Sequence, residues 1–451
     1  MQYDHDNISP LDNRYAGKVS QFRNNFSESA LIRIRFEIEI EWLLFLCTNL
    51  TKSFKPLSKE SIKKINRFKN SFDDKYVLQI KKIESTTNHD VKAVEYFIAN
   101  HFNKDKVLCK YVHLIHFGLT SEDINSLSYA CLVKNGISLF INESVKINKT
   151  LKKYTKKWAN ISFLARTHGQ AASPSTLGKE FKVFSTRLER ELEILKTIKP
   201  LAKFSGATGN FHTFELVDSS INWPKENKKF LKKFGVEQNL YTTQIEPHDW
   251  IAETSHSIVR INNILTDLSQ DCWMYISNDI FKLKLNKNEV GSSTMPHKVN
   301  PIDFENSEGN LGLSNSLMSF FADKLTKSRL QRDLSDSTVL RNLGVGFGYS
   351  YLGITSCLNG LSKIQPNKQN ARTELADNWQ VLAEALQIVM KLEGYDNAYE
   401  EIKTKTRGQN IDKDSYLKIV DGLKITAKSK DKLKKLTPLN YLGIASKLAK
   451  L

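Results

Sequence analysis

An apolar residue recurs at steps of three and four positions from Ile258 to Tyr275, and this spacing limits the fold more than any other feature of the chain. Because an α-helix has 3.6 residues per turn, such a series lies along one side of a long helix and forms a seam against another helix. The members are Ile258, Ile261, Leu265, Leu268, Cys272 and Tyr275, and two further series with helical spacing are Phe181, Phe184, Leu188, Leu192 and Leu195, and Trp379, Leu382, Leu386, Val389 and Met390. We therefore expect long helices to dominate residues 111 to 360, and another helix to follow. The sulfur-containing and aromatic members belong to the core, with no cofactor implied.

Residues 32 to 41 alternate apolar and charged side chains, a period that by itself is typical of a strand. The same residues place Arg35 four positions before Glu39, which is the spacing of an ion pair on a helix. An apolar run, residues 42 to 47, follows without a turn. This continuity favours one long helix over a strand.

The composition is that of an ordinary folded protein, with 451 residues, 40% of them hydrophobic and 25% charged. This length predicts more than one domain. The first residues show no secretory signal, and the apolar run at 42–47 is far shorter than the ~20 residues of a membrane span. The cysteines are odd in number and scattered without a CxxC pair, so we expect reduced thiols in a cytoplasmic protein. They are Cys47, Cys109, Cys131, Cys272 and Cys357.

The formal net charge of +17 is spread over several lysine clusters, at residues 152–157, 228–233 and 428–435. Neither interleaved aromatic residues nor arginine-rich recognition patterns accompany these clusters. Net charge informs on solubility and on the steering of ligands rather than on a specific role. We therefore expect no nucleic-acid or membrane partner. Whether the charge steers an anionic substrate stays open.

The stretch 291–301, Gly-Ser-Ser-Thr-Met-Pro-His-Lys-Val-Asn-Pro, separates two segments of helical character. Pro296 and Pro301 lack the amide donor of a helix or a strand, and each disfavours helical backbone at the residue before it. The glycine and the serines are turn formers. A polar loop that carries hydroxyl groups, Lys298 and Asn300 is typical of a functional loop on a rigid frame. An ordinary surface connection is the alternative that these residues alone leave open.

This stretch resembles the GSSxMPxKxNP signature of the fumarase/aspartase superfamily at every fixed position. Six further blocks resemble the bacterial branch of the adenylosuccinate lyase family: residues 12–15, 86–91, 116–123, 166–170, 242–248 and 332–341. The resemblance runs from about residue 8 nearly to the C-terminus. It implies an all-α fold with three domains, at 1–110, 111–361 and 362–451, and a homotetramer whose central long helices form a twenty-helix core. It also implies a carbon–nitrogen lyase of purine biosynthesis that releases fumarate and needs no cofactor or metal.

Elimination of fumarate requires a base that removes a proton from the carbon beside a carboxylate, and an acid that protonates the departing nitrogen. The resemblance assigns Ser292 as the base and His168 as the acid. Ser293 matches a substrate contact, and the sequence does not exclude it as the base. Because a serine is a poor base at its usual pKa, we expect Lys298 and the loop amides to favour the serine anion.

A histidine works best as an acid when a carboxylate holds its tautomer and its charge. The resemblance implies that Glu305 is the carboxylate that holds His168, and Glu308 is the alternative. The positions that match nucleotide and phosphate contacts are Arg14, Tyr15, Arg332, Ser337, Thr338 and Arg341. The other positions that match substrate contacts are Asn88, His89, Asp90, His116, Thr120, Ser121, Gln244, Ser293, Val299, Asn300 and Asn306.

Three alternatives to this interpretation have less support in the sequence. A zinc site at His89, His113 and His116 needs convergent ligands, and no Cys or His-Glu-x-x-His pattern supports one, so we expect no metal. Another lyase of the superfamily, such as argininosuccinate lyase, fumarase or aspartase, has no phosphate to bind and no need of the phosphate-matching arginines. A structural or nucleic-acid-binding protein on the same fold would be free to lose Ser292 and His168, and both are present.

Overall fold

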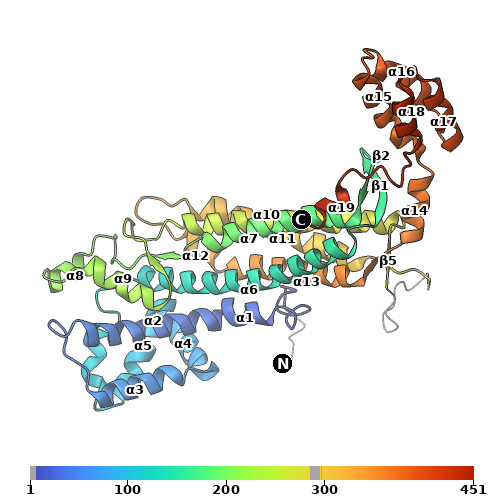
Figure 1. The fold of residues 1–451 in the computed structure, drawn as a ribbon. Coiled ribbons are helices and arrows are strands. Elements are labelled where there is room, and N and C mark those ends of the chain that lie inside the picture. Colours follow the sequence, from blue (N-terminus) through green and yellow to red (C-terminus); the bar gives the residue numbers. More distant parts are fainter. Residues whose placement is uncertain (1–6, 285–294, 296) are drawn as a thin grey trace. The chain divides into compact units, whose positions relative to one another are not determined.

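The structure is a computed structural model that describes residues 7–284, 295 and 297–451 (Figure 1). The chain forms two compact units, here unit 1 (1–143, 191–263 and 310–353) and unit 2 (144–190, 264–309 and 354–451). Five long helices supply residues to both units: α6 (Ser121–Lys157), α7 (Leu177–Thr197), α10 (Asp249–Ser277), α11 (Ile302–Leu325) and α13 (Leu343–Lys363). The prediction that long helices dominate residues 111 to 360 is confirmed.

The apolar series of the sequence are buried along these helices. In α10 the five members from Ile258 to Cys272 are buried, and Tyr275 is half-buried. All five members of the α7 series are also buried. The third series spans the 3₁₀ helix η2 (Trp379–Leu382) and α15 (Ala383–Leu392). None of the helices in the described ranges combines the length and the apolarity needed to cross a membrane.

Unit 1 begins with a group of helices around α2 (Glu28–Asn49), so the helical interpretation of residues 32–41 is confirmed. The Ser27 hydroxyl accepts a hydrogen bond from the Ala30 amide at 3.3 Å, which starts α2 directly after α1 (Ser20–Phe26). The helices α3 (Lys59–Asn70), α4 (Asp74–Thr87) and α5 (Asp90–Asn103) pack around α2, and the 3₁₀ helix η1 (Leu108–Leu114) follows. Because α2 is covered on most sides, its polar side chains need buried partners.

Residues 200–248 complete unit 1 with short elements. They are β3 (Leu201–Ala202), α8 (His212–Val217), α9 (Trp223–Lys233) and β4 (Glu237–Gln238), with β3 and β4 parallel. The ring of Trp42 in α2 contacts Phe204 and Phe230, both at 5.0 Å between ring centroids. This aromatic packing fixes the segment against α2. The short helix α12 (Ser335–Leu340) precedes α13.

Unit 2 contains a hairpin that the sequence analysis did not predict. Strands β1 (Ser162–Thr167) and β2 (Gln170–Thr176) pair antiparallel and are joined by His168 and Gly169. Both turn residues have positive φ, 52° and 74°, as a two-residue type I′ hairpin turn requires. A second small sheet pairs β5 (Phe281–Leu283) with β6 (Ile364–Pro366).

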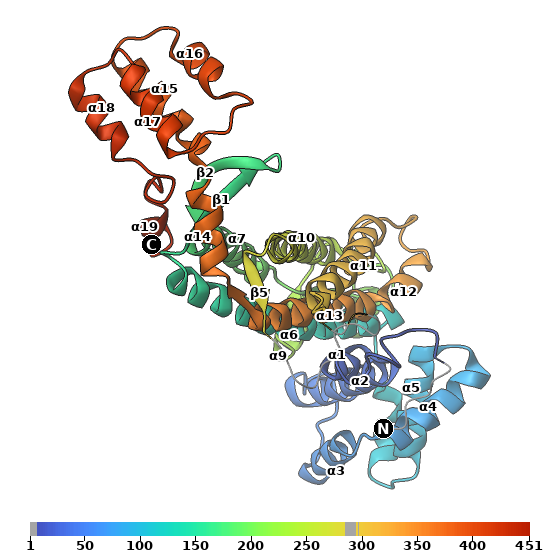
Figure 2. The same cartoon turned by 90° about the vertical axis from the view of Figure 1, so that its right-hand side faces the viewer.

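The C-terminal part of unit 2 is a group of short helices (Figure 2), and these helices share an apolar core with Leu164 of β1. It is built from α14 (Lys368–Ala376), α15, α16 (Ala398–Thr406), α17 (Lys413–Gly422) and α18 (Ala427–Lys434), and α19 (Ala445–Leu448) follows. Leu386, Met390 and Tyr416 are among the buried core residues. The short helices pack through apolar faces, as the spacing of the third series predicts.

Candidate active site

Asp90, the first residue of α5, holds two guanidinium groups in unit 1. Its Oδ2 lies 2.9 Å from Arg35 Nη1 and 2.6 Å from Arg341 Nη2. Its Oδ1 accepts a hydrogen bond from the Val91 amide at 2.8 Å. Burial by itself would raise the pKa of Asp90, but the two cations and the amide outweigh it and lower that pKa. The carboxylate is therefore charged at neutral pH.

Arg341 is paired a second time, because its Nη1 lies 2.9 Å from Glu28 Oε2 in α2. The Glu28 side chain is 41% exposed, while that of Asp90 is 24% exposed. An anionic ligand at Arg341 would therefore displace the more exposed Glu28 more easily than it would displace Asp90. The positive charge of Arg341, the expected phosphate contact, is thus already balanced by Glu28 and Asp90 in the absence of a ligand.

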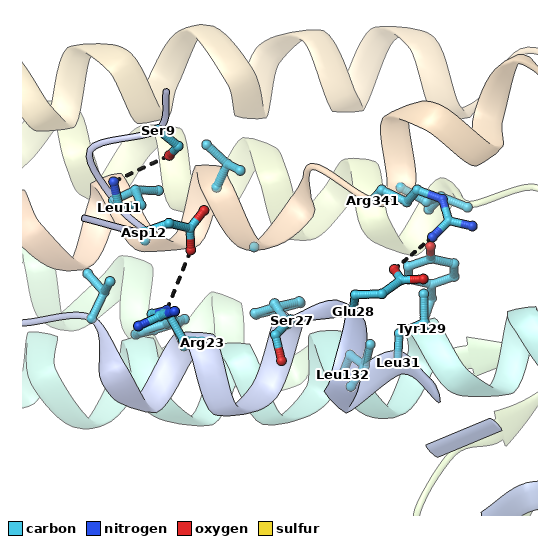
Figure 3. Close-up of a pocket in the computed structure, with 17 residues that line it drawn as sticks. Ser9, Leu11, Asp12, Arg23, Ser27, Glu28, Leu31, Tyr129, Leu132 and Arg341 are labelled. Carbon is cyan, nitrogen blue, oxygen red and sulfur yellow. Dashed lines mark hydrogen bonds and ion pairs between the residues drawn. The ribbon is translucent and has the colours of Figure 1, made fainter. Parts of the chain in front are cut away.

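A cavity of about 340 Å³ extends from this ion pair (Figure 3). Arg341 and Glu28 lie at one end, and Asp12 and Arg23, whose charged atoms are 3.5 Å apart, lie at the other. Apolar side chains form most of the wall between them: Leu11, Val19, Phe22, Phe26, Leu31, Leu132, Leu340 and Val345. Such a cavity accepts an apolar or aromatic group next to a charged one.

The ion pairs of Asp90 continue through α6 to a third arginine, Arg332. Arg35 Nε donates to Asn125 Oδ1 at 3.0 Å, and Asn125 Nδ2 donates to Glu122 Oε1 at 2.6 Å. Glu122 Oε1 lies 2.9 Å from Arg332 Nη2, and Arg332 Nη1 donates to Gln244 Oε1 at 3.3 Å. One polar network, which we name the arginine network, thus runs from Glu28 to Gln244. It consists of Glu28, Arg341, Asp90, Arg35, Asn125, Glu122, Arg332 and Gln244.

The arginine network joins four residues that the sequence analysis assigned to substrate: Asp90, Gln244, Arg332 and Arg341. The other four members were missed. Arg35 could have been identified from the sequence, because a charged residue within an apolar helix needs a buried partner. The pairing itself joins positions far apart in the chain, which no local pattern reveals.

His116 follows η1 and has a positive φ of 57°. Its Nδ1 lies 2.6 Å from Glu39 Oε1 and 3.8 Å from Glu95 Oε1. Burial alone would lower the pKa of His116, but the neighbouring carboxylates outweigh it and raise that pKa. Glu39 and Glu95 were not assigned to the site from the sequence.

Asp123 fixes the loop that carries Thr120 and Ser121. Its carboxylate accepts hydrogen bonds from the amides of Thr120 at 2.8 Å and Ser205 at 2.9 Å, and from Lys203 Nζ at 2.6 Å. The side chains of Asp123 and Lys203 are both fully buried. A buried ion pair with this many hydrogen bonds sets the local geometry. It holds Thr120 and Ser121 at the start of α6.

His248 joins the loop of Gln244 to α12. The ring is buried, with Nδ1 3.4 Å from Glu246 Oε2 and Nε2 3.9 Å from Asp336 Oδ2. Burial would lower the pKa of His248, but the two carboxylates raise it to about 9. Ser337 and Thr338 follow Asp336 in α12. The contact between His248 and Asp336 therefore positions two residues that the sequence predicts to contact phosphate.

The other assigned residues of unit 1 lie at helix ends and in the N-terminal segment. Asn88 ends α4 with a φ of 50°, and the His89 ring accepts a hydrogen bond from the Lys92 amide at 3.1 Å, which caps α5. The Arg14 guanidinium lies 5.9 Å from the Tyr15 ring centroid. The structure describes no hydrogen bond that ties Arg14 to the arginine network.

His168 belongs to unit 2, at the exposed tip of the β1–β2 hairpin. Next to it, the Arg166 guanidinium pairs with Glu374 of α14 and donates to the Gly169 carbonyl at 3.4 Å. Within the described residues His168 forms no ion pair with a carboxylate. The hairpin therefore presents the imidazole outward from its own chain.

The described part of the signature stretch 291–301, namely Met295 and residues 297–301, belongs to unit 2. Ser292 and Ser293 lie outside the described residues, Lys298 and Val299 are exposed, and Asn300 is half-buried before α11 begins. In the first turns of α11, Glu305 Oε1 accepts a hydrogen bond from Trp273 Nε1 at 3.1 Å, Asn306 is exposed, and Glu308 accepts one from Gln270 at 2.9 Å. The described residues contain no Glu305–His168 ion pair, so that pairing stays a prediction.

Two family models match the chain, one described as lyase over residues 13–313 and one as adenylosuccinate lyase C-terminal over residues 328–442. The adenylosuccinate lyase of Legionella pneumophila (strain Corby) is 47% identical over 445 residues, 98% of each chain. That of Buchnera aphidicola subsp. Schizaphis graminum is 44% identical over 443 residues, 98% of this chain and 97% of the other. That of Escherichia coli (strain K12) is 43% identical over 440 residues, 97% of this chain and 96% of the other.

Two crystal structures share the fold at low identity. The fumarate lyase from Mesorhizobium sp. BNC1 has a TM-score of 0.79 at 16% identity and covers 96% of both chains. The 3-carboxy-cis,cis-muconate lactonizing enzyme from Pseudomonas putida has a TM-score of 0.75 at 16% identity, covering 96% of this chain and 95% of the other. These likenesses show the expected all-α fold. Together with the family models and the chain-long identity to curated relatives, they establish that the chain belongs to the adenylosuccinate lyase family and is an enzyme of the lyase class.

Proposed function

We propose that the chain releases fumarate from adenylosuccinate, giving AMP, and from SAICAR, giving AICAR. The observation that carries this proposal is the identity of 43–47% to adenylosuccinate lyases over nearly the whole chain. The arginine network supports it, since it places two guanidinium groups, Arg332 and Arg341, in one connected set. Guanidinium groups bind phosphate through two parallel hydrogen bonds, and a nucleotide monophosphate supplies that partner.

The proposed reaction moves two protons. Ser292 removes a proton from the carbon beside a carboxylate of the succinyl group, the carbon–nitrogen bond breaks, and His168 protonates the nitrogen as fumarate leaves. Lys298 favours the Ser292 anion, and Glu305 holds the charge of His168. Negative charge builds up on the carboxylate during the first transfer, so hydroxyl donors such as those of Thr120 and Ser121 stabilise it. No metal or cofactor takes part in this proposal.

We further propose a homotetramer with composite active sites, a twenty-helix core and the domain division 1–110, 111–361 and 362–451. Large apolar side chains exposed on three of the long helices support an assembly: Val183 and Ile194 on α7, Trp273 and Met274 on α10, and Ile302, Leu313 and Phe320 on α11. The outward-facing His168 supports sites completed by another subunit. A cytoplasmic location is proposed because all five cysteines are free thiols.

The test is the absorbance change on fumarate release by the purified full-length chain. Adenylosuccinate and SAICAR are expected to react, while argininosuccinate, malate and aspartate are not. The variant His168→Ala controls for a contaminating host lyase. Turnover of argininosuccinate, or equal rates for wild type and variant, would overturn the proposal.

A further inference from the structure

We propose that Glu39 and Glu95 are positioning residues that hold His116 as an imidazolium, so that its second ring nitrogen donates a charged hydrogen bond to an anionic group of the substrate. This inference rests on the proposed function, since it assigns a role within the same site. It names two carboxylates that the sequence analysis did not assign. The anionic group fits a carboxylate of the succinyl moiety, which an imidazolium recognises by both charge and donor.

The contact at Nδ1 leaves the second ring nitrogen of His116, Nε2, for a ligand. Glu39 Oε1 lies 2.6 Å from His116 Nδ1, a short contact, and hydrogen bonds between charged partners are shorter than neutral ones. The Glu39 side chain is fully buried, and its Oε2 accepts no hydrogen bond among the described residues. Glu95 lies 3.8 Å from the same Nδ1. With Nδ1 held by a buried carboxylate, only Nε2 is left for a ligand.

A count of the charged groups around His116 favours the protonated ring. The groups that face it are Glu39 from α2, Glu95 and Lys92 from α5, and Asp123 from α6 with its partner Lys203. Three carboxylates thus meet two ammonium groups. Burial also raises the pKa of Glu95, against the opposing charges of His116 and Lys92. Because a buried charge without a partner is costly, one more positive charge beside Glu39 is favourable. A protonated His116 supplies it, and the raised pKa of His116 agrees.

A metal ion is the alternative to an imidazolium, because the ligand atoms of Glu39, Glu95 and His116 lie within 4.8 Å of one another. Two observations favour the imidazolium. Ligands about 2.1 Å from a tetrahedral zinc ion are roughly 3.4 Å apart, whereas Glu39 Oε1 and His116 Nδ1 are separated by only 2.6 Å. In addition, Lys92 Nζ lies 2.7 Å from Glu95 Oε2 and already supplies a cation to that carboxylate.

The first experiment compares pH profiles of kcat/KM for wild type, Glu39→Gln and Glu95→Gln, each as the full chain. Glutamine keeps the size of the side chain and removes its charge. Each variant is expected to lose about tenfold or more in kcat/KM at pH 8, mainly through KM, and to recover toward pH 6, where an unsupported histidine is protonated. Glu41→Gln is the matched control, since Glu41 lies in the same helix and pairs with Lys69 and Lys233 rather than with His116.

The second experiment measures the protonation of His116 directly, by NMR of ¹³C-histidine-labelled protein with the signal assigned by its loss in His116→Gln. The wild-type ring is expected to stay protonated at pH 7.5, and the Glu39→Gln ring to be neutral there. A neutral wild-type ring, or variant pH profiles that match wild type, would overturn the inference, as would a stoichiometric metal ion whose removal abolishes binding. If wild type releases no fumarate, the proposed function fails, while the NMR result still decides the state of His116.

Discussion

Arg35, in the middle of α2, and Asp90, at the start of α5, form an ion pair of 2.9 Å in which the Arg35 side chain is only 2% exposed. A buried cation of this kind has few alternatives, because water cannot replace its partner. The pair therefore ties the helix that carries Glu28 and Glu39 to the helix that carries an assigned substrate residue. Helix α2 therefore supports the candidate site through Arg35, Glu28 and Glu39, whose side chains pair with residues of the site.

Arg35→Met is expected to lower the free energy of unfolding by about 3 kcal/mol, since it leaves Asp90 without its buried cation and Asn125 without its donor. Asp90 keeps Arg341, so the loss falls at the low end for a broken buried pair. Thermal and urea unfolding of the purified protein at fixed concentration measure this loss of free energy. Arg33→Met, at an exposed position of the same helix, is the control and is expected to stay within about 0.5 kcal/mol of wild type. Equal losses in the two variants would contradict the role of the pair.

Arg341→Ala is expected to raise KM for adenylosuccinate by about tenfold or more with a smaller change in kcat, because a phosphate contact far from the reacting bond contributes mainly to binding. Steady-state kinetics at fixed ionic strength check this. Arg23→Ala removes the other cation that lines the same cavity, and its KM is expected to stay near that of wild type. An unchanged KM in Arg341→Ala would remove this residue from the phosphate site.

His168→Ala and Ser292→Ala are each expected to lose ~10²–10⁴-fold in kcat, the usual contribution of a single acid or base. The assembly is expected to stay intact, because His168 is exposed on the tip of its hairpin. Fumarate release and light scattering of the same samples test both statements. Ser293→Ala decides between the neighbouring serines, and a larger loss there than in Ser292→Ala would exchange their roles.

The free energy of unfolding is expected to fall with rising pH because of His248 and its two carboxylate neighbours, Glu246 and Asp336. Because the folded-state pKa of about 9 exceeds the unfolded value near 6.5, the charged ring stabilises the fold fully below pH 6.5 and this contribution disappears as the pH rises through 9. The contribution is on the order of 3 kcal/mol. The difference in Tm between wild type and His248→Gln should therefore shrink from pH 6.5 to 9.5. His256→Gln, at an exposed position of α10, should show no such convergence.

The helices could be predicted because their apolar spacing is local: the series in α7 and α10 mark both the elements and their buried faces. The hairpin was missed because β1 and β2 are stabilised by a turn at His168 and Gly169 whose backbone conformation no periodicity reveals. In the site, the spacing of Arg35 and Glu39 correctly indicated a helix. Their actual partners, Asp90 and His116, are set by the packing of α2 against distant segments and could not be read from that spacing.

The arginine network has a consequence for the energetics of ligand binding. Its three guanidinium groups, Arg35, Arg332 and Arg341, meet three carboxylates, Glu28, Asp90 and Glu122, so its formal charge sums to zero without a ligand. A dianionic nucleotide that binds there adds charge to a neutral set. Complex formation should then draw a proton from solution or release Glu28 into water, and calorimetric titrations in buffers of different ionisation enthalpy would show which.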